Sequence, residues 1–321
     1  RGGSMPSTIT HSYFTKDLYD QLPYNIKNKI ILSRLRMFGQ GTDPLMFYLY
    51  NKKIRDIQYI QHTSKSKDFF INMVEYMKNN HIDDSDSISM LTGFICHYVL
   101  DYTIHPFIIY KTGIFIPGNI STYKYNSMHH FMENFIDNYM IKRRESINPY
   151  RFPIGKVCFD LKRFNKNTID TLDYTFDKTF SYKNMGKIYY KSCSYMKMAL
   201  IIARRDVYGI KKFFYKLIDT FTTNRFIKFE CISYHQNFND KFNFLNSDHK
   251  LWRNPSIYSR TSNESFDDLY NKAIKIAKVK VCAAYQYING EPVDLNVIFE
   301  NNSYLTGIDE DLNKSIQFFE Y

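Results

Sequence analysis

Three residues that could bind a metal ion recur at every fourth position of one apolar segment. They are His97, Asp101 and His105, within residues 85–111 (SDSISMLTGFICHYVLDYTIHPFIIYK). If this segment is a helix, positions four apart differ by only about 40° around its axis, so the three side chains share one face. A charged aspartate in an apolar helix is costly unless it is paired or binds a metal. The spacing therefore predicts a cluster of metal ligands on this helix.

A second segment, residues 127–144, repeats the four-residue spacing with His129, Glu133 and Asp137. Zinc readily accepts imidazole nitrogen and carboxylate oxygen as ligands, and catalytic zinc sites also keep a water molecule. Two such helices facing each other would bring these side chains to one point, which we predict to be a metal-centred active site. Ferritin-like di-iron bundles are the obvious competitor, but they use ExxH spacing, which neither segment contains.

Three further candidates, His11, Asp43 and His62, lie apart from these two segments and are ambiguous on their own. His11 falls in the first turn of a predicted helix, Asp43 precedes a proline in a glycine-rich loop, and His62 lies within another helical pattern. Each is more often a capping, turn or structural residue than a ligand. Near the second segment's ligands, His130 is expected to pack or to lie at the surface. Asp137 either orients a ligand imidazole or is solvated.

The elements that must position these residues are predicted to be helices. Tyr (28) and Phe (27) are abundant and Gly (12) is scarce, which favours a helical, aromatic-packed protein over a turn-rich β sandwich. We predict an all-α fold, a multi-helix bundle with a helical C-terminal extension. Further helical patterns cover residues 6–22, 26–38, 57–77, 188–221 and 266–287. The pattern at 188–221 is amphipathic and predicts one or two core helices. Thr261 with Glu264 forms a predicted capping box before the last helix.

The first four residues, RGGS, resemble a tag remnant ahead of Met5 and are excluded from the fold. Residues 5–321 are expected to form a single domain, with a metal-ligand core at 5–145 and a helical remainder at 146–321. No signal-like segment follows Met5 and no run of about 18 apolar residues occurs, so a cytoplasmic protein is expected. The five cysteines include no CxxC pair, which argues against a disulfide framework or a cysteine-based zinc site.

The formal net charge is +11, from 43 basic and 32 acidic residues. A basic surface attracts phosphate-bearing partners such as anionic lipid headgroups, nucleic acid or phosphorylated metabolites. The basic residues are scattered, however, with only short runs such as residues 142–144. A solvated basic surface is therefore the simplest interpretation, and no obligate protein partner is indicated.

These motifs together resemble those of the zinc-dependent phospholipase C family, which is related to the single-strand-specific zinc nucleases. The resemblance is specific from Met5 to about Arg144 and is closest to uncharacterised bacterial members. It rests on ITH (9–11), TDPL (42–45) and DYTIHP (101–106), and more softly on HKLWRNP (249–255), SFDDLY (265–270) and SYLTG (303–307). The family is all-α, binds up to three zinc ions and hydrolyses phosphodiesters, so the resemblance implies the same fold and chemistry here.

The resemblance also implies a role for each candidate ligand. Asp101 matches the carboxylate that bridges two metals, and His97 matches the first ligand on its helix. Asp43 matches the loop aspartate that ligates the paired metals and can act as the base. The remaining matches are His62 with the histidine that follows that loop, His11 with the early histidine, and His105, His129 and Glu133 with a third site.

Two departures from the family pattern affect the expected metal content. His105 is nearer to Asp101 in the sequence than its counterpart in the secreted phospholipases. Secreted members also complete one site with a mature N-terminal Trp, whereas Met5 and Pro6 precede His11 here and no Trp is near. We therefore expect two zinc ions, and the metal held by His11 and Asp101 stays open.

The resemblance implies a zinc-dependent phosphoric ester hydrolase of phospholipase C type, in which a multinuclear zinc site activates water against a phosphodiester. Asp43 is the expected catalytic residue, and the substrate is a phosphate ester such as a phospholipid or a nucleic acid. One alternative is a nuclease-like phosphodiesterase, which would need aromatic stacking platforms and a basic groove. Another is a non-catalytic protein with a structural zinc cluster. Structural sites usually have four protein ligands each, and eight candidates cannot close three sites, which favours catalysis.

Overall fold

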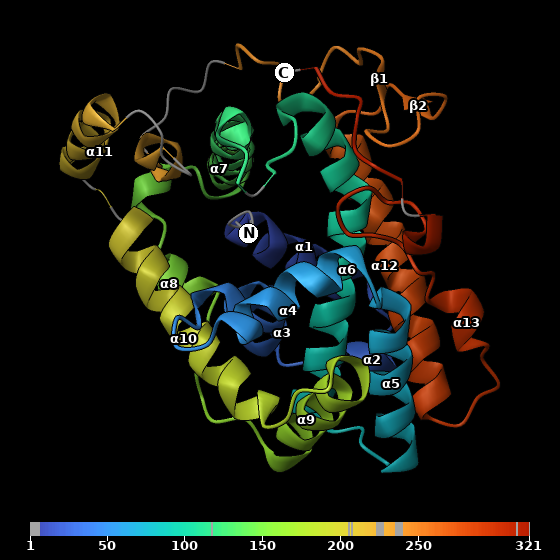
Figure 1. Ribbon diagram of the computed structural model, residues 1–321. Coiled ribbons are helices and arrows are strands. Elements are labelled where there is room, and N and C mark those ends of the chain that lie inside the picture. The colour runs from blue at the N-terminus through green and yellow to red at the C-terminus, as the bar shows by residue number, and fades with distance from the viewer. Residues whose placement is uncertain are drawn as a thin grey trace.

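The computed structural model describes residues 7–116, 118–204, 206, 208–222, 228–234, 240–312 and 314–320. In this part of the chain the protein is a bundle of helices with one small sheet of two short strands (Figure 1). The all-α prediction is therefore confirmed. The expected tag remnant at residues 1–4, together with Met5 and Pro6, lies outside the described residues.

The elements of the N-terminal half include the two segments predicted to carry most of the ligands. Residues 85–111 correspond to α6 and residues 127–144 to α7, so both helices are confirmed with small shifts at their ends. The order is α1 (Thr8–Gln21), α2 (Tyr24–Lys27), α3 (Leu32–Phe38), the 3-10 turn η1 (Asp43–Phe47), α4 (Lys52–Thr63), α5 (Ser66–Asn79), α6 (Ser85–Thr112), η2 (Ile120–Thr122) and α7 (Tyr123–Glu145).

The C-terminal half is helical over most of its described length. Residues 240–262, which contain both strands, and residues 299–309 form no helix. The two strands pair antiparallel, with Trp252 opposite Ser262. The order is η3 (Pro149–Arg151), α8 (Ile154–Val157), α9 (Lys166–Phe180), α10 (Met185–Arg204), α11 (Ile210–Phe221), η4 (Phe229–Ile232), β1 (Trp252–Arg253), β2 (Thr261–Ser262), α12 (Phe266–Ile288), α13 (Leu295–Ile298) and η5 (Glu310–Leu312).

Helix α6 is the axis around which the other helices are arranged (Figure 1). Asp84 caps its start by accepting hydrogen bonds from the backbone N–H groups of Asp86 and Ser87, both at 3.1 Å. Gly113, at φ +74°, ends it. Almost every side chain along α6 is buried, because α1, α3, α7 and α12 pack around it. A helix that is apolar on all sides belongs in a core, and the candidate ligands on α6 are therefore buried with it.

The start of α1 is held by the carboxylate of Asp137 on α7. Asp137 is completely buried and accepts hydrogen bonds from the hydroxyls of Ser7, Thr10 and Tyr234 at 2.8–3.0 Å. It also accepts from the backbone N–H groups of Ile9 and Thr10 at 3.3 and 2.8 Å. A negative charge at a helix N-terminus satisfies unpaired N–H groups and complements the helix dipole. Asp137 is thus buried rather than solvated, and it fixes α1 against α7.

Two predicted helices are each divided in the structure. The pattern at 26–38 forms α2 and α3, because Ile31 is extended and donates its N–H to the Ser89 hydroxyl at 2.8 Å. The pattern at 57–77 belongs to α4 and α5, which Lys65 separates by adopting the left-handed conformation at φ +63°. Neither break involves a proline or glycine at the turn, so neither was visible as a sequence pattern.

The predicted capping box before α12 is displaced by four residues. Ser265 and Asp268 form it, each side chain accepting from the other's backbone N–H. Thr261 instead belongs to β2.

The pattern at 188–221, predicted to supply one or two core helices, forms α10 and α11, and α11 has no buried residue. In the described part of the chain, no helix combines the length and apolarity needed to cross a membrane.

Replacing Asp137 with Asn tests the anchor of α1. The amide cannot accept from all five donors, and the charge that complements the helix start is lost. We expect Asp137→Asn to lower the free energy of unfolding by about 2–4 kcal/mol, measured by urea denaturation. Asp83→Asn is the control, because Asp83 is half exposed in an ion pair with Lys29, and it should cost less than about 1 kcal/mol. Equal stability of the two variants would contradict the anchoring role.

Candidate metal centre

The eight predicted ligands come from five separate elements (α1, η1, α4, α6 and α7), and the structure brings them together. All are buried, and none exposes more than 8% of its surface. They form three groups in which one potential ligand atom per residue lies within 4.8 Å of the others. The groups are His11, His97 and Asp101; Asp43, His62 and His97; and His105, His129 and Glu133.

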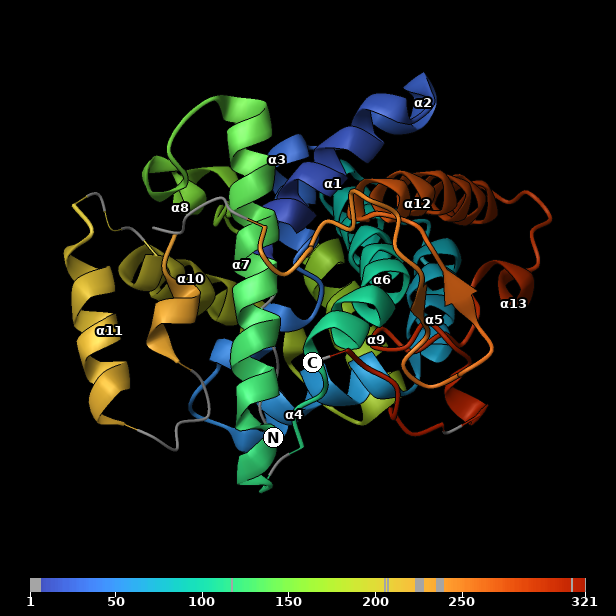
Figure 2. The ribbon, with the colours of Figure 1, turned by 90° about the horizontal axis from the view of Figure 1, so that it is seen from above.

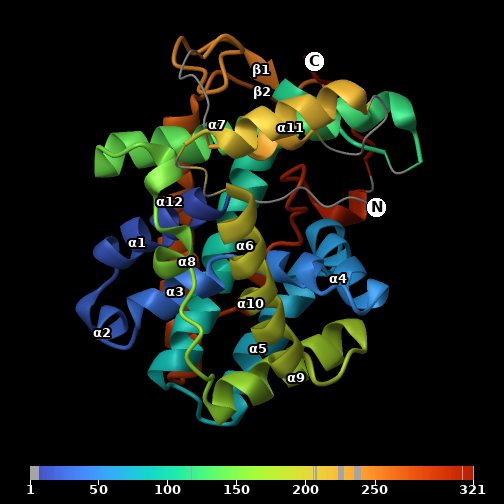
Figure 3. The ribbon, with the colours of Figure 1, turned by 90° about the vertical axis from the view of Figure 1, so that its left-hand side faces the viewer.

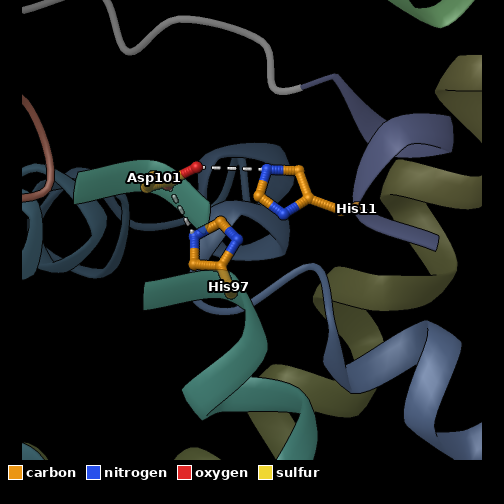
Figure 4. A group of neighbouring side chains, drawn as sticks. All are labelled: His11, His97 and Asp101. Atoms are coloured by element: carbon orange, nitrogen blue, oxygen red, sulfur yellow. Dashed lines mark ion pairs between the residues drawn. The ribbon is translucent and has the colours of Figure 1, made fainter. Parts of the chain in front are cut away.

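The carboxylate of Asp101 lies at the centre of the first two groups. Its Oδ1 is 3.2 Å from Nε2 of His11 and 3.8 Å from Nδ1 of His105. Its Oδ2 is 3.3 Å from Nε2 of His97 and 3.4 Å from Nε2 of His62. Figure 4 shows His11 approaching Asp101 from α1, while His97 lies one turn before Asp101 on α6. Each carboxylate oxygen thus faces a different set of imidazoles, which is the arrangement required of a carboxylate shared by two cations.

The electrostatics of this cluster favour the protonation states that bind metal. Burial alone would raise the pKa of Asp101, but the imidazoles of His97, His105 and His11 hold it well below its ordinary value. Burial lowers the pKa of His97 well below the usual range, and the neighbouring histidines add to this effect. A charged Asp101 beside a neutral His97 is the state in which both residues can donate an electron pair to a cation.

Asp43, in the loop at η1, is oriented by a residue that the sequence did not single out. The side-chain amide of Gln58 donates to Asp43 Oδ1 at 2.9 Å, and Oδ2 lies 3.6 Å from Nε2 of His97. The Gln58 backbone carbonyl accepts from Nδ1 of His62 at 2.8 Å, which leaves Nε2 of His62 facing Asp43 at 3.4 Å. Burial raises the pKa of Asp43 to about 6, although the His62 imidazole opposes the shift.

Glu133 organises the third group. Its Oε1 is 3.1 Å from Nε2 of His129 and 3.6 Å from Nε2 of His105. Burial would raise the pKa of Glu133, but the surrounding imidazoles hold it well below its ordinary value. Burial lowers the pKa of His105, yet the carboxylates of Asp101 and Glu133 raise it to about 9. His130 is buried rather than at the surface, with Nδ1 3.7 Å from Glu133 Oε2.

Several buried polar atoms of the cluster fit a metal. Within the described part of the chain, five of them have no hydrogen-bond partner: Nδ1 of His11, Oδ2 of Asp43, both ring nitrogens of His97, and Oε2 of Glu133. A buried polar atom without a partner costs about 1–3 kcal/mol, and such atoms are uncommon in folded proteins. Imidazole and carboxylate donors are also the set that zinc prefers outside cysteine sites. The residues present therefore suit zinc.

Gly41 gives the loop before Asp43 room to lie against His97. Its φ is +53°, and a Cβ added there would lie 2.0 Å from Cδ2 of His97. The Gly41 carbonyl accepts from the Tyr189 hydroxyl at 2.8 Å, which fixes the loop in this position. The glycine is visible in the sequence, but the contact that requires it is not.

Residues 303–307 cross the cluster from the far end of the chain. The Tyr304 N–H donates to the His62 carbonyl at 3.1 Å, and the Tyr304 ring packs on the His62 ring with centroids 4.6 Å apart. The Tyr304 carbonyl lies 3.1 Å from Nδ1 of His105; donation from Nδ1 leaves Nε2 free as a metal ligand. Gly307, at φ +60°, approaches the Tyr102 carbonyl so closely that a Cβ would lie 2.4 Å away.

Pro106 explains why the chain can approach α6 at this point. A proline inside a helix has no N–H to donate to the carbonyl four residues earlier, and for Pro106 that carbonyl belongs to Tyr102. Gly307 lies against this carbonyl. The SYLTG similarity noted in the sequence therefore corresponds to a segment that braces two of the candidate ligands.

A large cavity lies apart from the cluster. It measures about 1070 Å³, is lined by residues near α8 and α10, and includes none of the eight candidates. A cavity of about 20 Å³ is bounded by His11, Asp101, His105 and Glu133, among others. That volume corresponds to roughly one water molecule. Four of the eight candidate ligands thus line the smaller cavity.

Gly41→Ala tests the close approach to His97. The added methyl must displace the His97 ring, and overpacking of this kind costs about 1–3 kcal/mol. We expect lower thermal stability and fewer zinc ions bound per chain by elemental analysis. Gly290→Ala is the matched control, because Gly290 also has a positive φ (+92°) but open space around it. A zinc content equal to that of the control would contradict the predicted contact.

The carboxyl group of Glu310, three residues after the 303–307 segment, predicts that the stability of the protein depends on pH. Burial raises the pKa of Glu310 to about 7, against the hydrogen bond from the Ser66 hydroxyl at 2.8 Å. The folded state therefore holds this proton more tightly than the unfolded chain, and stability falls as pH rises from about 4.5 to 7.

Glu310→Gln cannot titrate and should abolish this fall. The free energy of unfolding of the variant, relative to that of wild type, should rise by about 1–2 kcal/mol between pH 5 and 8. This is less than the full pKa shift implies, because solvent partly screens the side chain. Urea midpoints at four pH values measure the difference. A constant difference across this range would rule out the buried titration.

A comparison with known proteins identifies the family of this chain. A sequence profile of the family described as zinc dependent phospholipase C matches residues 10–235, well over half of the chain. No match was found among curated proteins or among solved structures. The matched region contains all eight candidate ligands but not the segment that carries Tyr304. The chain belongs to the zinc-dependent phospholipase C family.

Proposed function

We propose that this protein is a zinc-dependent phosphoric ester hydrolase of phospholipase C type. Membership of a zinc-dependent phospholipase C family implies hydrolase activity. The observation that carries the proposal is the position of Asp101, whose two oxygens face His11 on one side and His62 with His97 on the other. This shared carboxylate is what a multinuclear metal site requires.

The proposed ligands divide into sites for two zinc ions and a third site of open occupancy. One set is Asp43, His62, His97 and Asp101, and the second is His105, His129 and Glu133. His11 with Asp101 offers the third. When bound, zinc would lower the pKa of a coordinated water and neutralise phosphate oxygens.

The protein groups around these sites support hydrolysis in distinct ways. Asp43 is the proposed base: Gln58 holds its Oδ1, while its Oδ2 has no hydrogen-bond partner among the described residues and is free to accept a proton. Gln58 also directs Nε2 of His62 toward the cluster by accepting from Nδ1. Burial of all eight ligands excludes bulk water from the reacting groups, which strengthens electrostatic interactions with a phosphate.

A closed structural zinc cluster is the alternative that the ligand count opposes. Structural sites are closed by about four protein ligands each. Eight candidates with one shared carboxylate leave open positions if two or three ions bind. The open positions are where water and a phosphate oxygen would enter.

Metal analysis combined with a substrate panel tests the proposal. The panel contains a chromogenic phosphocholine ester, bis-nitrophenyl phosphate and single-stranded DNA. We expect at least two zinc ions per chain and hydrolysis of one or more of these esters. Zinc at that stoichiometry without hydrolysis of any of them would indicate a structural cluster, and hydrolysis of DNA alone would indicate the nuclease-like alternative.

Asp101→Asn tests the shared carboxylate directly. The variant retains the shape of the side chain but loses the charge that two cations would share. We expect the helical content to be unchanged, the zinc content to fall, and kcat/KM to drop by about 100-fold or more, because losing a group that only supports a metal ligand already costs about 10–100-fold. Asp83→Asn, an exposed substitution of the same chemistry, is the control. Wild-type turnover in Asp101→Asn would refute the mechanism.

A further inference from the structure

Helix α11 presents an apolar stripe to solvent. The stripe follows the i, i+3, i+4 spacing of one helical face. It ends at Phe221, whose side chain is 79% exposed. Phe213 and Leu217, near its centre, are 65% and 43% exposed. The full stripe is Ile210, Phe213, Phe214, Leu217, Ile218 and Phe221.

The polar side of α11 faces the protein instead. The Lys211 ammonium donates to the carbonyl of Ile202 at the end of α10, and the Tyr215 hydroxyl donates to the carbonyl of Ala203 at 2.9 Å. The Asp219 carboxylate accepts from the N–H groups that open η4, at 3.0 and 2.8 Å. These contacts fix the orientation of the helix, so its apolar stripe points outward.

The outward orientation has a physical cost that an occupant would remove. Burying one large apolar side chain contributes about 1.5–3 kcal/mol, and contiguous exposed apolar patches mark interaction surfaces. Two further apolar side chains near α11 are exposed: Ile202, at the end of α10, and Tyr208, in the following turn, at 63% and 86%. Figure 2 shows α11 at one edge of the molecule, and Figure 3, which faces that side, shows it in front of α7. The η4 turn contacts both helices.

The position of α11 relative to the metal centre is set through η4. The side-chain amide of Asn134 on α7 donates to the carbonyls of Cys231 and Ser233 at 3.0 and 2.6 Å. Asn134 is the neighbour of Glu133, one of the candidate ligands. The apolar stripe is therefore attached to the helix that carries the third ligand group.

We propose that α11 is an interfacial helix that docks the protein on a lipid surface containing anionic headgroups. A stripe with three phenylalanines is typical of helices that lie in the membrane interface. No acidic residue lies on the stripe, because the carboxylate of Asp219 is turned inward. Lys216 lies exposed on the same helix, and the chain carries a net charge of +11. This charge suits an anionic surface.

The size of the stripe argues against a second copy of the chain as its occupant. Twelve residues make a helix about 18 Å long and about 10 Å wide. Such a face buries only a few hundred Å², whereas a stable interface needs about 800 Å² from each partner. Docking on a lipid surface requires no such minimum area. The lipid would also receive the exposed side chains of Tyr208 and Lys216. The proposal rests on α11 alone and holds whichever phosphate ester the metal centre hydrolyses.

Co-sedimentation with vesicles tests the docking surface without using activity. Wild-type protein is compared with Phe213→Asp/Leu217→Asp on phosphatidylcholine vesicles with and without about 30% phosphatidylglycerol. We expect wild type to bind the anionic vesicles, less so at high salt, and the variant to bind them about 100-fold more weakly, as the loss of two inserted apolar side chains implies.

Val297→Asp/Leu312→Asp is the matched control. It makes the same change of charge at two exposed apolar residues away from α11, which are 70% and 54% exposed, and should bind within about twofold of wild type. Equal weakening in both double variants would reduce the effect to net charge and overturn the proposal. Absence of vesicle binding by wild type would also overturn it, as would a concentration-dependent dimer that only Phe213→Asp/Leu217→Asp disrupts.

Discussion

The structure depends on keeping one charged carboxylate, Asp101, inside an apolar helix. An isolated buried charge would cost more than a fold of this size can offset. The cost is met by imidazoles from α1, α4 and α6, three of them within 3.4 Å of a carboxylate oxygen. Those imidazoles come from distant parts of the chain. They reach the Asp101 carboxylate only when α1, α4 and α6 are packed together, so stabilising this charge requires the helix bundle to be assembled.

Residues that touch no proposed substrate do much of this positioning. Asp137 anchors the start of the helix that carries His11, and Gln58 holds both Asp43 and His62. The Tyr304 carbonyl sets the orientation of His105. Ligands that approach a metal from several elements need such supports, since a small misplacement of a ligand lowers affinity and activity.

The sequence was informative where a feature repeats with the helical period. The four-residue spacing of His97, Asp101 and His105 was enough to place three ligands on one face, and the apolar pattern around them was enough to predict burial. The left-handed turn at Lys65 and the need for Gly41 were not predictable, because each follows from a contact made only in the folded protein. The pattern at 188–221 predicted one or two core helices, and α10 is the one that lies in the core. For α11, the pattern showed that the apolar residues share a face but not that this face points away from the core.

The bracing of His62 and His105 by residues 303–307 sets an order of events in folding. Helices α6 and α7 can form locally within microseconds. The contacts that complete the cluster join residues 241 and 199 positions apart in the chain, and such high contact order makes their formation slow. Enclosure of the candidate ligands is consequently a late step, and a nascent chain that has grown only to α7 carries all eight of them without the Tyr304 carbonyl that accepts from His105.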